Sequence, residues 1–167
     1  MASGCGEDEP TDPSTEEPDL LNDALALELS AIFAYETGAA ALSGEAAEQA
    51  DGFAKHAREH VELLREDIEE LGGTPVKERS DDFYRRDLAL DELDDAEDAE
   101  EVFLNIAADL SNMAVGTYIE LATKLTSAPL RRTAFEIAAV EAEQISVVLG
   151  ELGEPQVPDA LVVGAQP

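Results

Sequence analysis

The feature of this sequence that most constrains its fold is an acidic residue on the apolar stripe of a predicted helix. Between residues 21 and 42, apolar and small side chains recur at steps of three and four, the spacing that places them on one helical face. This face contains Leu21, Ala24, Glu28, Ala31, Tyr35, Gly38 and Leu42. Glu28 therefore points toward a neighbouring element. Because an unpaired buried carboxylate is costly, we expect a metal ion, a cation or hydrogen-bond donors beside it.

The same periodicity predicts four long helices, at residues 19–42, 45–71, 99–125 and 128–153. Ser43-Gly44 separates the first two, and Gly72-Gly73 ends the second. Pro129 suits the first turn of the fourth helix. Short turns within each pair make its helices antiparallel neighbours.

The two halves of the chain resemble each other. Tyr35 corresponds to Tyr118, and Glu70-Leu71-Gly72 corresponds to Glu151-Leu152-Gly153. Two helical hairpins joined by residues 74–99 predict an all-α four-helix bundle with one long crossover connection.

The composition agrees with one helical domain plus tails. The chain has 167 residues, 44% of them hydrophobic but only 5% aromatic, and it has no Trp. A core of Leu, Ala, Val and Ile favours packed helices over a sheet sandwich. We expect a disordered acidic tail at residues 1–18, the bundle at 19–155 and a C-terminal tail at 156–167.

The charge is strongly negative, with 39 Asp and Glu against 10 Lys and Arg, a formal net charge of −29. Such a field repels nucleic acid and anionic membrane surfaces, so neither is an expected partner. The acid excess, with more Arg than Lys, favours a halophilic surface adapted to high salt over that of an ordinary acidic secreted protein.

Cys5 is the only cysteine, which excludes an intrachain disulfide and a Cys-based zinc site. No apolar run predicts a transmembrane helix. Ala2-Ser3-Gly4-Cys5, followed by an acidic tail, resembles the end of a bacterial lipoprotein signal. That resemblance implies an extracytoplasmic protein with a lipid anchor at Cys5 on the cell surface. The alternatives are a free thiol and a cytoplasmic location.

Projecting the four stripes into one bundle brings an unusual number of polar side chains inside: Glu28, Tyr35, His60, Ser111, Tyr118, Glu141 and Gln144. Bundles that bind two iron or manganese ions supply a Glu from each of two helices and a Glu-x-x-His from each of the others. Over residues 19–155 the chain resembles the ferritin-like superfamily, especially its small bacterial and archaeal domains. The motifs that carry the resemblance are Glu28-x6-Tyr35, Ala57-x-x-His60, Ser111-x6-Tyr118 and Glu141-x-x-Gln144.

The resemblance implies a degenerate di-iron site. Of the family's ligand positions, Glu28, His60 and Glu141 are kept, whereas the others are Ala57, Ser111 and Gln144. A complete two-metal centre cannot form, but the resemblance implies that the three kept residues face one ion. Two carboxylates and one imidazole suit Fe(II), Mn(II) or Zn(II).

Two interpretations of this cluster remain open. In the first, a protonated His60 lies between the carboxylates in a metal-free network, and the protein is a binding or structural module. In the second, one metal ion serves an oxidoreductase or a metal-storage protein. Enzymatic activity is left open, and no hydrolase or nucleotide-binding motif is present.

Two further features carry expectations of their own. His56, Glu59 and His60 could form a surface metal site on the second helix, but such pairs are usually incidental. The Ala-rich helices are compatible with a homodimer, and nothing in the sequence indicates a cage.

Overall fold

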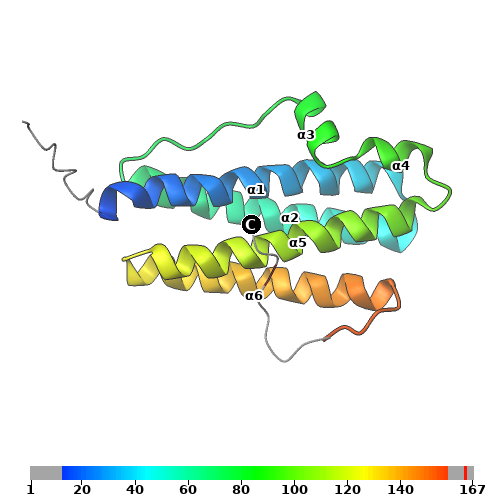
Figure 1. Cartoon of the computed structure of the whole chain (residues 1–167). Helices are drawn as coiled ribbons and strands as arrows, with labels where there is room; N and C mark the ends of the chain where they lie inside the picture. The colour runs from blue at the N-terminus through cyan, green and yellow to red at the C-terminus, as the bar shows by residue number, and fades with distance from the viewer. Residues whose placement is uncertain (1–12, 158–163, 165–167) are drawn as a thin grey trace, which may run out of the picture.

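Four long helices form a bundle of two antiparallel hairpins in the computed structural model, which describes residues 13–157 and Gly164 (Figure 1). The first hairpin is α1 (Pro13–Ala41) with α2 (Gly44–Glu70), and the second is α5 (Ala99–Lys124) with α6 (Ala128–Glu151). The prediction of an all-α four-helix bundle is confirmed. Cys5, the predicted anchor, lies outside the described residues. No described helix is long and apolar enough to cross a membrane.

Both hairpins end in the same capping motif, as the internal repeat suggests. After α2, Gly72 has φ +78, its N–H bonds to the Glu69 carbonyl, and the Gly73 N–H bonds to the Ile68 carbonyl. After α6, Gly153 has φ +76, and the Gly153 and Glu154 amides make the corresponding bonds to Gly150 and Leu149. This Schellman arrangement needs a residue at positive φ, which glycine adopts without strain. Local chemistry therefore sets where each hairpin stops.

The core consists of two apolar clusters with a polar layer between them. One cluster contains Leu25, Val61, Leu121 and Ile137, and the other contains Ala54, Phe103, Leu110 and Val148. On α2, α5 and α6, buried polar residues lie between the segments that supply these clusters: His60, Ser111, Glu141 and Gln144. On α1, Glu28 lies next to Leu29, where the segment of the first cluster gives way to that of the second.

The long connection is more ordered than its sequence suggests. Its first part is extended, and two short helices follow, α3 (Asp81–Asp87) and α4 (Asp91–Asp95), which the sequence did not predict. Ser80 caps α3 by accepting the Phe83 N–H. Leu90 and Leu93 are buried against the second cluster. Tertiary packing thus orders a stretch that has no sustained periodicity.

Helix α1 begins at Pro13, not near Asp19 as the periodicity predicts, so the predicted acidic tail overlaps its first turns. Glu17 is only 3% exposed. Its Oε1 accepts the Thr126 and Ser127 N–H groups at 2.6 and 3.2 Å and the Thr126 hydroxyl at 2.8 Å. These donors lie just before α6, so Glu17 links the start of α1 to the start of α6.

Burial raises the pKa of Glu17, but hydrogen bonds from Thr126 and Ser127, together with the nearby charge of Arg131, lower it below the ordinary 4.5. A carboxyl with a lowered folded pKa contributes stability above its unfolded pKa, and that contribution is lost as the pH falls through the folded value.

We expect Glu17→Gln to lower the free energy of unfolding by about 1–2 kcal/mol at pH 7, because a neutral amide oxygen accepts these bonds less strongly. The difference should shrink as the pH falls below 4.5, measured by urea unfolding at several pH values. Asp19→Asn, at an exposed position of the same helix, is the matched control. If both variants lowered the free energy of unfolding equally at pH 7, the link that Glu17 makes between α1 and the start of α6 would be contradicted.

Candidate metal centre

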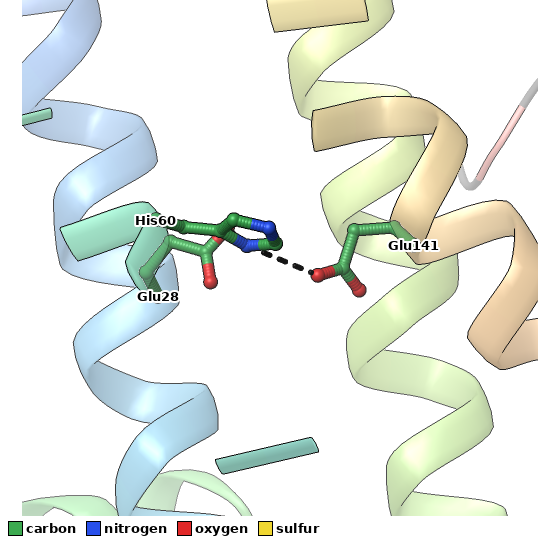
Figure 2. Close-up of side chains that lie close together, drawn as sticks. All are labelled: Glu28, His60 and Glu141. Atoms are coloured by element: carbon green, nitrogen blue, oxygen red, sulfur yellow. Dashed lines mark ion pairs between the residues drawn. The ribbon is translucent and has the colours of Figure 1, made fainter. Parts of the chain in front are cut away.

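Three buried side chains from three helices converge in the polar layer. Glu28 comes from α1, His60 from α2 and Glu141 from α6, and they point toward one another (Figure 2). They are 1%, 6% and 3% exposed. Their candidate ligand atoms all lie within 4.8 Å of one another. The structure thus brings together the three residues that the sequence singled out, although their role as metal ligands stays a prediction.

The imidazole faces both carboxylates. His60 Nδ1 lies 3.2 Å from Glu28 Oε1 and 3.5 Å from Glu141 Oε1. Although these are ion-pair distances, Nδ1 does not have the geometry of a hydrogen bond to either oxygen or to any other group in the described part of the chain. A buried polar atom without such a bond is uncommon in folded proteins and calls for a physical explanation.

Tyr118 supports Glu28 from α5. Its hydroxyl donates to Glu28 Oε1 at 2.7 Å, inside the core. Burial raises the pKa of Tyr118 well above its ordinary value, and the nearby charge of Glu28 acts in the same direction. The phenol therefore stays protonated and remains a donor. A donor of this kind offsets part of the cost of burying the Glu28 charge.

The second tyrosine has a different partner. The Tyr35 hydroxyl and Ser111 Oγ lie 3.2 Å apart in a buried hydrogen bond. Burial, and then the charge of Glu141, raise the pKa of Tyr35. Tyr35 also packs against Phe53 and Phe103, with ring centroids 5.6 and 6.4 Å away. This tyrosine is therefore held by Ser111 and by apolar rings.

The surroundings of the Glu141 carboxyl perturb its pKa strongly. Burial raises its pKa to about 7, and the charge of Glu28 acts in the same direction. His60, Ser111 and Gln144 oppose this rise. For His60, burial lowers the pKa, but the contact with Glu28 and the charge of Glu141 outweigh burial and raise it. Without a bound cation, the cluster therefore retains protons near neutral pH.

The donor set fits one metal ion. An ion with bonds of about 2.1 Å holds its ligand atoms roughly 3–4 Å apart, which matches the spacing from Nδ1 to the two carboxylates. A buried Nδ1 without a hydrogen bond has a lone pair free for an ion when the imidazole is neutral. The two carboxylates would balance the charge of a divalent cation.

The remaining positions of a two-metal site do not supply acids. Ala57 is buried and offers no ligand atom, and Ser111 is engaged with Tyr35. Gln144 is buried, and its Oε1 has no hydrogen-bond partner in the described part of the chain. This amide oxygen is a further neutral oxygen atom in the layer, and helical periodicity could not show that it lacks a partner.

The alternative surface site on α2 is not assembled. His60 is turned into the core, whereas His56 and Glu59 are exposed, and Glu59 lies 3.8 Å from the Lys55 ammonium. Among the described residues, the one group of three His, Cys, Asp or Glu side chains with metal-binding spacing is the buried cluster.

The fold, the inward carboxylates and the helix-two histidine all point to one family. The sequence model of the ferritin-like domain matches residues 16–154, which is most of the chain. The chain belongs to the ferritin-like domain family. A comparison with curated proteins gave no match. The ferritin-like bundle thus contains a buried Glu-His-Glu cluster that could hold a metal ion, and the family assignment confirms the resemblance seen in the sequence.

With chelator present, we expect this cluster to reduce stability as the pH rises. The pKa of Glu141 is higher in the folded state than its ordinary value of 4.5. Glu141 therefore has no effect on the free energy of unfolding below pH 4.5, and it destabilises the fold increasingly as the pH rises to about 7. His60 acts in the same direction, because the stability from its raised pKa is present below 6.5 and is lost as the pH rises through the folded value.

The free energy of unfolding of Glu141→Gln, relative to that of the wild type, should therefore rise by about 1–3 kcal/mol between pH 5 and pH 8 in the presence of chelator. Thermal unfolding followed by circular dichroism at each pH measures this. Glu143→Gln, exposed on the same helix, controls for the general effect of removing one negative charge. A Glu141→Gln difference that stays constant with pH would contradict the raised pKa.

Proposed function

We propose that this ferritin-like bundle binds a single divalent transition-metal ion, Fe(II), Mn(II) or Zn(II), through Glu28, His60 and Glu141. The observation that carries the proposal is the buried Nδ1 of His60, which faces two carboxylates at 3.2 and 3.5 Å without a hydrogen bond to either. Such a donor set suits borderline divalent metals rather than Ca²⁺, which prefers oxygen ligands alone.

A single ion, rather than two, follows from the positions that lack acids. Ala57 and Ser111 stand where a second ion would need carboxylates, and both are buried. On that side of the layer, the hydroxyl groups of Tyr35 and Ser111 are hydrogen-bonded to each other. Among the described residues, the ligands available are therefore the carboxylates of Glu28 and Glu141 and the neutral imidazole of His60.

A bound ion would supply Lewis acidity, and iron or manganese would add redox chemistry. The protein's own residues do the positioning. Tyr118 holds Glu28 through a hydrogen bond, and the apolar clusters on either side exclude water from the layer. This arrangement is compatible with an oxidoreductase or a metal-storage role.

A second candidate function is a metal-free structural or binding module. The raised pKa values of Glu141 and His60 favour it, because they allow the cluster to neutralise itself by retaining protons. In that case the layer would specify the packing of the hairpins without binding a metal. The metal content of the purified protein separates the two functions.

The full chain, purified without chelator and without nickel affinity, should contain about one iron, manganese or zinc ion per chain by elemental mass spectrometry. Glu141→Ala should remove the ion, because it deletes one of two charged ligands. Glu143→Ala, exposed two residues away, should keep it. A wild type free of these metals would overturn the single-metal proposal, and two ions per chain would show that the second position is not lost.

We further propose, from the sequence alone, that the protein is held at the cell surface by a lipid on Cys5. Support comes from the small residues before Cys5 and the acidic segment after it. In the native host, the wild type should partition into the detergent phase of a Triton X-114 extraction, and Cys5→Ser should move to the aqueous phase. Aqueous partitioning of both would favour a location without an anchor. The halophilic surface and the homodimer also stay predictions.

A further inference from the structure

The crossover connection runs along α1 and is attached to it at two places (Figure 1). Near its start, the Asn22 amide donates to the Thr74 carbonyl at 3.1 Å and accepts the Val76 N–H at 2.8 Å. Further along, the Tyr84 ring of α3 packs on Phe33 of α1, with centroids 5.1 Å apart. The chain between these attachments is held beside the helix.

A surface cavity of about 480 Å³ lies between these attachments. This volume is within the range of small-molecule sites, roughly 300–1,000 Å³. Apolar side chains form much of its wall: Leu27, Leu29, Val76, Phe83 and Tyr84. Leu29 and Tyr84 are buried, so the floor belongs to the packed part of the protein. We call this the crossover cavity.

The charge of the crossover cavity is opposite to that of the chain. Two cations line it, Lys77 and Arg79, against one acid, Asp87. In a protein with 39 acidic and 10 basic residues, a local excess of cations is unexpected. Within the described residues, neither cation makes an ion pair. The Arg79 guanidinium lies 4.2 Å over the Phe83 ring, an arrangement that positions it but leaves N–H groups for an anion.

A neighbouring cavity provides a contrast. It shares Leu29, Arg79 and Tyr84 with the crossover cavity and adds Arg58 and Arg65. Those two arginines are neutralised, since Arg58 pairs with Glu36 and Arg65 lies 3.6 Å from Glu78. Among the described residues, both cations of the crossover cavity lack an ion pair, whereas the arginines that the neighbouring cavity adds to the shared Arg79 are paired.

We propose that the crossover cavity binds a monocarboxylate with an apolar body, of the medium-chain fatty-acid type. The carboxylate pairs with the Arg79 fork and the Lys77 ammonium, and the hydrocarbon covers Leu27, Leu29 and Val76. Arg and Lys are the side chains that recognise carboxylates, and the apolar wall favours a ligand with hydrocarbon over a bare inorganic anion. This site does not depend on the metal layer.

Isothermal titration calorimetry of the full chain with decanoate, below its micellar concentration and at constant ionic strength, tests the proposal. We expect one saturable site, with decanol, the uncharged analogue, at least tenfold weaker. Arg79→Gln should weaken decanoate binding roughly tenfold, because it removes a charge-assisted contact. Arg132→Gln is the matched control, since Arg132 is exposed on α6 and paired with Glu136.

Ala26→Trp provides a second variant, because Ala26 lines the cavity and a large side chain there fills it. It should abolish decanoate binding while circular dichroism and metal content stay those of the wild type. The proposal would be overturned if decanol and decanoate bound with equal affinity. It would also be overturned if Arg79→Gln and Arg132→Gln weakened decanoate binding equally. A third contradicting result would be a dimer, seen by light scattering, that Ala26→Trp dissociates, because a second copy of the chain would then occupy the cavity.

Discussion

The burial of two carboxylates and an imidazole in one layer is the constraint on which the rest of the structure depends. Removing such charges from water costs several kcal/mol for each ion unless partners replace the solvent. Glu28 is compensated by the Tyr118 hydroxyl and by His60, and His60 also faces Glu141 at 3.5 Å. Glu28 and His60 belong to the first hairpin, and Tyr118 and Glu141 belong to the second, so these contacts form only when both hairpins are in register. A shift of one turn would leave charged groups against Leu and Ala.

The ends of the bundle contribute to that register. Both hairpins stop at a glycine with positive φ, at Gly72 and Gly153, so α2 and α6 have defined lengths on either side of the layer. Glu17 then ties α1 to the turn before α6. The crossover connection is attached along α1 through Asn22. Of these contacts, the one made by Glu17 joins the two hairpins directly, away from the polar layer.

Much of the architecture could be predicted because it depends on local chemistry. The periodicity placed helix ends at residues 42, 71 and 125, and the structure ends them at Ala41, Glu70 and Lys124. Ser-Gly and Gly-Gly sequences favour turns, and here they mark the ends of α1 and α2. The start of α1 was missed because the burial of Glu17 depends on Thr126, more than a hundred residues away in the sequence. Likewise, α3 depends on packing that no periodic pattern shows, such as Tyr84 on Phe33.

By itself, the sequence determined the fold class and the set of side chains that point inward, because helical periodicity fixes the face on which each residue lies. It also determined that the acids of a second metal position are absent, since Ala57 and Ser111 cannot become carboxylates. Only the tertiary structure decided which inward groups meet. Periodicity contains no information about the rotation and height of one helix relative to another, and these set the contacts of His60 with both carboxylates and of Tyr35 with Ser111. The same relative placement brings Lys77 and Arg79 to one cavity with an apolar wall, although nothing in their local sequence predicts that they line it together.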